Sequence, residues 1–196
     1  MYRKIENYLI LCGGKSEIAY IQQLNRYLNQ NNYLFSFIPK YIGNGHFHPV
    51  RRKYQNTKKE NPRQNNINIW VDKDTYTRND NGDKEAYDNK GFDIPDFMFN
   101  TNNFEDFLVM HMPSDVVYKW QDLCRKKRHF EFPMQESEYL PLYRQCMFQE
   151  YEKGSIPISL TCDTIQEALA NQKNTEVLFK SDFLDFLSNL IELHKK

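Results

Sequence analysis

Two short apolar segments, each followed at once by polar residues, constrain the fold of this chain most strongly. Residues 8–12 (YLILC) precede GGKSE at 13–17, and residues 67–71 (INIWV) precede DKD at 72–74. Apolar runs of this length are typical of strands buried on both faces of a parallel sheet. In an open sheet of that kind, ligands bind in the crevice outside the carboxyl ends of the strands. The pattern therefore predicts an α/β fold with a site where these two segments end.

Strand-like and helical patterns alternate along residues 1–112. Ser16 is a good N-cap, and apolar residues follow it at helical spacing as far as the stop at 30–32. The other predicted elements are a strand at 34–42 with Pro39 marking a bend or an edge, a helix at 48–60, a polar loop or short helix at 74–91, a strand at 96–100 and a helix capped by Asn103. This order favours a mostly parallel sheet flanked by helices, with right-handed crossovers.

The second part of the chain, residues 113–196, reads as helical. Helices are expected at 116–128, 140–153, 162–171 and 180–194, as an extension packed on the same domain as the α/β core of 1–112. A chain of 196 residues with 40% hydrophobic residues can form one well-packed domain. No apolar run approaches the roughly 20 residues of a membrane span, and the N-terminus does not resemble a signal peptide. Four scattered cysteines indicate a reduced, cytoplasmic compartment.

Three carboxylates are candidates for a metal site. Asp72 and Asp74 alternate with Lys73, so in extended chain both carboxylates point the same way. Such oxygen ligands suit Mg²⁺ or Mn²⁺, although D-x-D is also frequent in ordinary loops. Glu17 lies in the first turn of the helix after the first strand. Its carboxylate faces the same crevice, or it is a surface residue favoured by the helix dipole.

Candidate phosphate contacts are local, because 26 basic and 26 acidic residues give a net charge of zero. Gly13 and Gly14 before a helix could hold an anion through backbone N–H groups, or could simply form a tight turn. The segment does not match the ATPase P-loop motif, since Leu9 stands where that motif needs glycine. The basic candidates are Lys15, Arg51, Arg52 and the cluster Arg125, Lys126, Lys127 and Arg128. Solvated helix faces are an equal alternative for both arginine-containing groups.

Three histidines and one further glutamate complete the candidates. His46 and His48 are interpreted as turn residues or phosphate contacts beside the arginines. Glu105 and His111 belong to the helix after the fourth strand, but their spacing of six residues does not require a shared ligand. A lone histidine at a helix end is as often structural as functional.

Together, these blocks resemble the RloB-like branch of the Toprim family. The resemblance rests on CGGKSE after the first strand with Tyr20 in the following helix, DKD after the second strand, and Phe104-Glu105 with residues 108–111. It implies a Toprim fold that binds Mg²⁺ and cuts phosphodiesters, in phage defence by abortive infection, beside an ATPase partner. The family places a glutamate directly before the glycine of its first motif, whereas this chain has Gly13 there.

The sequence therefore predicts a metal-dependent nuclease acting on DNA or RNA, including tRNA. Asp72 and Asp74, with Glu17 nearby, would hold Mg²⁺ or Mn²⁺, and Glu17 or Glu105 would supply a further ligand or base. Gly13, Gly14 and His111 are possible supporting residues. The alternative is a catalytically inactive Toprim-like adaptor that binds nucleic acid or the ATPase partner.

Overall fold

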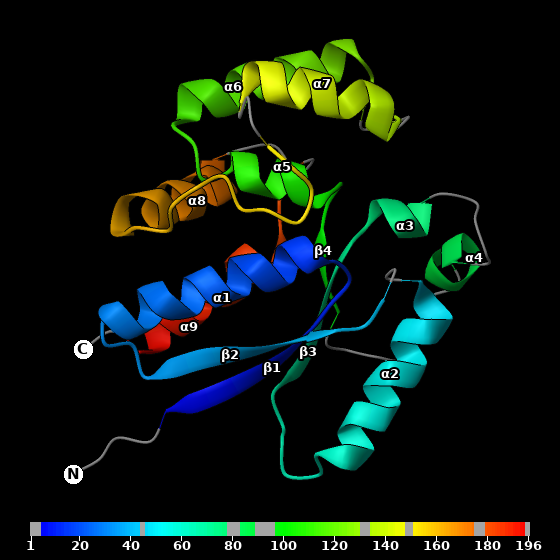
Figure 1. Ribbon diagram of the computed structural model, residues 1–196, viewed down its shortest axis with the longest axis vertical. Helices are drawn as coiled ribbons and strands as arrows, with labels where there is room; N and C mark the ends of the chain where they lie inside the picture. The colour runs from blue at the N-terminus through cyan, green and yellow to red at the C-terminus, as the bar shows by residue number, and fades with distance from the viewer. Residues whose placement is uncertain are drawn as a thin grey trace.

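Four parallel strands form the centre of the molecule (Figure 1). The computed structural model describes residues 5–43, 46–77, 83–88, 97–129, 134–147, 151–174 and 179–194. The strands are β1 (Glu6–Cys12), β2 (Phe35–Tyr41), β3 (Ile67–Asp72) and β4 (Phe97–Asn100), in the spatial order β2-β1-β3-β4. The α/β class is as predicted, and β1 and β3 are adjacent and parallel with Cys12 opposite Trp70. Pro39 lies on an edge strand, as its missing N–H requires.

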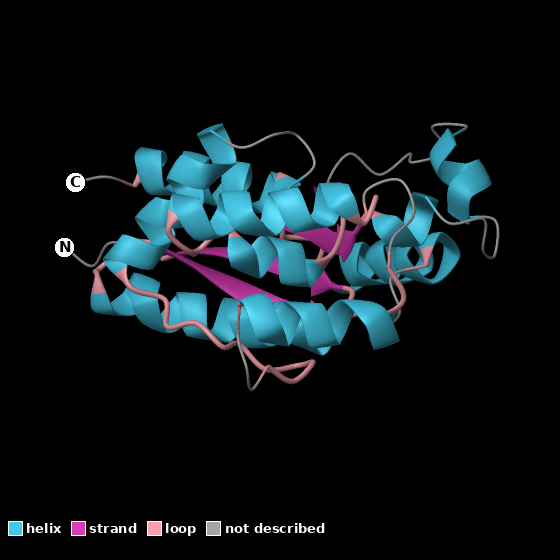
Figure 2. Ribbon diagram, turned by 90° about the horizontal axis from the view of Figure 1, so that it is seen from above, coloured by secondary structure: helices cyan, strands magenta, loops and turns pink. Residues whose placement is uncertain are grey.

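Helices lie on both sides of the sheet (Figure 2). Their bounds are α1 (Lys15–Gln30), α2 (Phe47–Glu60), α3 (Asp74–Thr77), α4 (Asp83–Asp88), α5 (Phe104–Val109), α6 (Ser114–Lys126), α7 (Glu136–Cys146), α8 (Cys162–Asn174) and α9 (Asp182–Leu193). In Figure 1, α1 and α9 lie between the sheet and the outer helices α6 and α7. Among the described residues, no helix has the length and apolar character that crossing a membrane requires.

The unbroken apolar run of β1 is explained by burial on both faces of the sheet. Ile10 and Cys12 belong to the larger core cluster, which includes residues of α1 and α9, while Leu9 and Leu11 belong to a second cluster with residues of α2 and α3. Successive strand residues point to opposite faces, so a strand covered on both sides must be apolar throughout.

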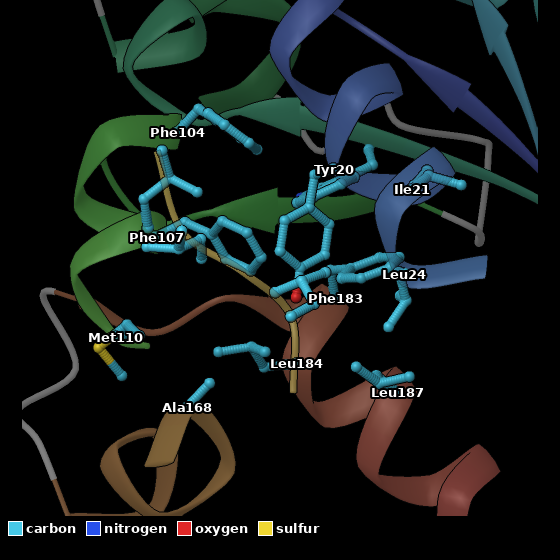
Figure 3. Packing of buried hydrophobic residues seen from close by; sticks show 14 of the residues in the cluster. Tyr20, Ile21, Leu24, Phe104, Phe107, Met110, Ala168, Phe183, Leu184 and Leu187 are labelled. Carbon is cyan, nitrogen blue, oxygen red and sulfur yellow. The ribbon is translucent and has the colours of Figure 1, made fainter. Parts of the chain in front are cut away.

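The larger core joins the two parts of the chain. Phe183 of α9 stacks on Trp70 of β3, with ring centroids 4.1 Å apart and planes at 12°. Tyr20 of α1 lies in the same cluster, with side chains of α5, α8 and α9 around it (Figure 3). The backbone of Ser181 also forms an antiparallel bridge with Asn100 at the end of β4. Residues after 113 therefore complete the core that residues before 112 begin.

Two predicted helix limits are wrong. The N-cap of α1 is Gly14 rather than Ser16, whose hydroxyl instead accepts a hydrogen bond from the Gly154 N–H at 3.0 Å. The helix predicted at 140–153 ends at Cys146, and residues 151–154 are not helical. The chain leaves the helical conformation at Met147, with φ −123° and ψ −70°, and the later contact of Gly154 with Ser16 is a long-range one that local periodicity cannot reveal.

The predicted extended arrangement of Asp72 and Asp74 is also wrong. The strand ends at Asp72, and Asp74 is the first residue of the short helix α3. The Lys73 N–H donates to the carbonyl of Asn100, and the Asp74 N–H donates to the carbonyl of Asn102. The first bond continues the pairing of β3 with β4, and the chain leaves the strand direction where α3 begins at Asp74. The carboxylates of Asp72 and Asp74 therefore do not lie on one face of a strand.

Candidate functional site

A pocket of about 320 Å³ opens at the carboxyl end of the sheet, where β1 and β3 end. It is lined by Gly13, Gly14, Lys15, Ser16, Glu17, Val71, Asp72, Thr75, Phe104, Glu105, Lys153 and Gly154. These residues come from the β1–α1 turn and the first turn of α1, the end of β3, the short helix α3, the start of α5 and the segment before α8. The pocket thus joins Glu17, Asp72 and Glu105, three acidic residues far apart in the sequence.

Glu17 is held by the start of α1. It is the third residue of the helix, and its carboxylate accepts a hydrogen bond from the backbone N–H of the N-cap Gly14. This is the return half of a capping box. Burial raises the pKa of Glu17 to about 7, because the loss of solvation outweighs the backbone hydrogen bonds, and the charge of Glu105 raises it further. A Cβ at Gly14 would collide with this carboxylate, so a larger residue there would require the Glu17 side chain to move.

Asp72 is oriented by a buried hydrogen-bond chain. The Asn100 Nδ2 donates to Asp72 Oδ1 at 2.8 Å, while Asn100 Oδ1 accepts from Trp70 Nε1 at 3.0 Å and Ser181 Oγ at 2.8 Å. Burial, followed by the charge of Glu17, raises the pKa of Asp72 well above its usual range, against the lowering effect of Asn100. The amide fixes one carboxylate oxygen, so the direction of Asp72 is set before any ligand binds.

Glu105 enters the pocket from the first turn of α5. Asn103 caps this helix as predicted, since its Oδ1 accepts from the Asp106 N–H at 2.9 Å. The Tyr151 hydroxyl donates to Glu105 Oε1 at 3.0 Å. Burial raises the pKa of Glu105, whereas Lys153 and the Tyr151 hydroxyl lower it. Glu105 is thus held by a residue that lies 46 positions away in the sequence.

Two lysines supply positive charge to the same pocket. Lys15 is exposed at the start of α1, and Lys153 is half-exposed and pairs with Glu136 of α7 at 2.9 Å. Partial burial lowers the pKa of Lys153, but the hydrogen bond with Glu136 and the nearby charge of Glu105 outweigh it, so its pKa is raised. Three buried carboxylates whose pKa values burial raises, with the charge of Glu105 acting on Glu17 and that of Glu17 on Asp72, suit a divalent cation, and the two lysines beside them suit an anionic substrate.

The remaining acidic and histidine candidates lie outside the pocket lining. Asp74 is half-buried near Asp72, whose pKa its charge raises, but it does not line the pocket. His111 follows the end of α5 and is buried, with its Nε2 in a hydrogen bond of 2.8 Å with the Tyr20 hydroxyl. Burial lowers the pKa of His111 to about 4. His111 is therefore a neutral core residue, which agrees with the structural interpretation.

The basic candidates other than Lys15 are distributed over two other regions. His46 precedes α2, and its Nδ1 hydrogen-bonds Oδ2 of the buried Asp83. His48 and Arg52 line a second pocket, separate from the one that holds Glu17. Arg51 is half-buried on α2 and lines neither of the two pockets. The cluster Arg125, Lys126, Lys127 and Arg128 is exposed at the end of α6, where Arg125 pairs with Asp122 and Lys127 with Glu138.

In a second cluster of potential metal ligands, the side chains are already engaged in hydrogen bonds with one another and with their neighbours. Asp106, Cys124 and His129 are buried, with ligand atoms within 4.8 Å of one another. His129 Nδ1 accepts from the Met134 N–H at 3.0 Å, so its Nε2 carries the proton and donates to Asp106. The oxygens of Asp106 also accept from Asn102, Trp120 and Tyr139. Burial raises the pKa of the Cys124 thiol. No imidazole lone pair remains for a cation, so the cluster fastens α6 to α5.

Comparisons with known proteins do not extend this description. No family model matches the sequence, and neither the curated proteins nor the solved structures give a significant match.

Three residues of the site were not anticipated from the sequence. The sequence predicts Asn100 only as the last residue of a strand, and it places Tyr151 and Lys153 within the helix predicted at 140–153. An amide at the end of a parallel strand, as for Asn100, was a usable signal, because that sheet edge is where polar groups gather. For Tyr151 and Lys153 the sequence carries no such signal, since their segment reaches the site through long-range contacts.

Proposed function

We propose that this chain is a metal-dependent nuclease of Toprim type. The observation that carries the proposal is the meeting of Glu17, Asp72 and Glu105 in one pocket at the carboxyl edge of a parallel sheet, with Lys15 and Lys153 beside them. A nucleic acid substrate, a role in phage defence and an ATPase partner extend the proposal through the sequence resemblance.

The carboxylates fit a magnesium or manganese ion. Asp72 is held by Asn100 and Glu105 by Tyr151, so both proposed ligands are fixed by neutral donors that leave a carboxylate oxygen available. Such an ion would supply Lewis-acid stabilisation of charge on a phosphoryl oxygen. A bound cation would also offset the neighbouring negative charges that, after burial, raise the pKa values of Glu17 and Asp72.

The chain's own residues account for substrate binding and proton transfer. Lys15 and Lys153 attract the phosphodiester, and the exposed position of Lys15 leaves its ammonium free to approach a phosphate oxygen. Glu17 is the proposed base in place of the family's glutamate before the first glycine, and it acts in its ionised form, which a cation bound nearby favours. It follows the same strand and faces the same pocket as Gly13.

A cleavage assay tests this function. The wild-type chain is incubated with pooled DNA, mRNA and tRNA, with Mg²⁺, Mn²⁺ or EDTA. We expect metal-dependent cleavage by the wild type, loss of cleavage in Asp72→Asn and Glu17→Gln, and unchanged cleavage in the surface control Asp115→Asn, whose side chain is exposed on α6. Circular dichroism verifies that all variants are folded. Cleavage that persists in Asp72→Asn would remove this pocket from the reaction.

One observation favours a catalytically inactive adaptor as the second candidate. The Glu17 carboxylate already caps α1 through the Gly14 N–H, so it has a structural role without catalysis. Gly13 supplies no carboxylate at the position where the family has its glutamate. A Cβ at Gly13 would lie 3.1 Å from Val71 Cγ1, a contact that a small shift relieves. A wild type inactive on all three substrates, with cleavage in Gly13→Glu, would establish the adaptor.

A further inference from the structure

A second pocket, of about 440 Å³, lies beside the end of β2. It is lined by Ile42, which follows β2, and by residues of the first two turns of α2 and the turn after them, His48, Pro49, Arg52, Lys53 and Asn56. These α2 residues recur at helical spacing on the face away from the buried Val50, Tyr54 and Thr57. The pocket is therefore built by one helix face against the end of the edge strand.

The lining of this pocket combines positive charge with an apolar surface. Arg52, Lys53 and His48 offer donors for phosphate oxygens, and none of the described lining residues is acidic. Across the described part of the chain, neither Arg52 nor Lys53 has an ion-pair partner, whereas Lys40 pairs with Glu60. Ile42 and Pro49 add apolar surface next to these charges. A nucleotide carries the matching pair of groups, a phosphate and a flat base.

The two pockets lie along the same edge of the sheet. The Ile42 N–H donates to the carbonyl of Cys12 at 3.0 Å, and the Gly13 N–H donates to the carbonyl of Trp70 at 3.1 Å. The ends of β2, β1 and β3 are thus hydrogen-bonded in a row. Two strand spacings separate β2 from β3, about 10 Å. A polynucleotide strand that reaches Asp72 needs only a few nucleotides to reach Ile42.

We infer that this second pocket, the β2 pocket, binds one nucleotide of a single-stranded nucleic acid. A neighbouring phosphate of the same strand, the one that reacts, then lies at the first pocket, which holds Glu17, Asp72 and Glu105. The inference rests on the proposed function and adds a substrate class to it. The phosphate contacts Arg52 and Lys53, and the base or sugar packs on Ile42 and Pro49. A single strand is specified because its bases are available for such packing, whereas a duplex keeps them stacked inside.

Binding of labelled oligonucleotides in EDTA tests the inference without requiring catalysis. The probes are fluorescein-labelled oligo(dT) and oligo(U) of about 15 nucleotides and a duplex of equal length, measured by anisotropy over a range of salt concentrations. Arg52→Ala with Lys53→Ala is compared with Lys58→Ala with Lys59→Ala. The control pair removes the same charge from α2, more than one helical turn further along the helix and outside the pocket.

We expect the pocket variant to bind single strands at least tenfold more weakly at 0.1 M salt, with the salt slope reduced by about 1.4, which corresponds to two phosphate contacts. The control variant should change affinity less than threefold. Equal losses in both variants, equal or tighter binding of the duplex, or no binding of single strands by the wild type would each overturn the inference. Binding with this signature but without cleavage would refute the nuclease and leave the second pocket as a single-strand binding site of the adaptor. Metal-dependent cleavage by a pocket variant with unchanged binding would keep the nuclease and overturn the inference.

Discussion

Replacing Glu17 with glutamine should stabilise the metal-free protein at alkaline pH. Burial raises the pKa of Glu17 from 4.5 to about 7, so its folded state holds the proton more tightly than its unfolded state does. Below about pH 4.5 the carboxyl is protonated in both states. The free energy of unfolding then falls as the pH rises from there through 7, because the buried carboxyl resists ionisation. The difference in pKa, at about 1.36 kcal/mol for each unit, corresponds to about 3 kcal/mol.

Glutamine should recover most of that amount. Its carbonyl oxygen can still accept from the Gly14 N–H, so the cap is kept while the charge is removed. The neutral side chain also ceases to raise the pKa of Asp72. At pH 8 in EDTA, we expect the free energy of unfolding to rise by about 2 to 3 kcal/mol, or the Tm by roughly 4 to 12 °C for a chain of this size. At pH 4 the variant and the wild type should be nearly equal.

Urea unfolding followed by tryptophan fluorescence measures this difference, since Trp70 and Trp120 are both buried. Glu152→Gln is the matched control, because Glu152 is exposed beside the same pocket and should change stability little at either pH. Mn²⁺ should then stabilise the wild type at pH 8 and stabilise Glu17→Gln less. A Glu17→Gln variant that is no more stable than the wild type at pH 8 would refute the argument that this carboxylate is buried with its charge uncompensated.

Three further substitutions test the packing around the site. Phe183→Ala should lower the free energy of unfolding by about 3 to 5 kcal/mol in urea, because it removes the ring that stacks on Trp70, and a loss below 1 kcal/mol would show that α9 is not part of the core. Tyr151→Phe should lower the free energy of unfolding by about 1 kcal/mol. It should also shift the pH dependence of Mn²⁺ affinity to higher pH, because the hydroxyl that lowers the pKa of Glu105 is gone. An unchanged pH profile in calorimetry would contradict this contact. Gly13→Ala should cost no more than about 1 to 3 kcal/mol with an unchanged circular dichroism spectrum, because the nearest side-chain carbon lies 3.1 Å from the added Cβ, and failure to fold would mean that glycine is required there.

The local pattern of the sequence was sufficient to predict the strands and the edge of the sheet that carries the site. Residues 8–12 and 67–71 are apolar throughout because both faces of β1 and β3 are covered, and a run of that kind is visible without any structure. Parallel strands end at a common edge, so Gly13 and Asp72 had to lie near each other once the two runs were adjacent strands. The cap at Asn103 is equally local, because its partner is the N–H three residues later.

Only the tertiary structure decided which polar residues share the pocket and what charge they carry. Asp74 does not line the pocket, because the chain turns into α3 there, and His111 lies in the core beside Tyr20. Lys153 was brought in by contacts between residues more than a hundred positions apart, such as Gly154 with Ser16. The raised pKa of Glu17 depends on burial, which is a property of the whole packed molecule. The hydrophobic periodicity of the sequence reflects the place of each residue within its own helix or strand, whereas these contacts depend on how the helices and strands pack against one another.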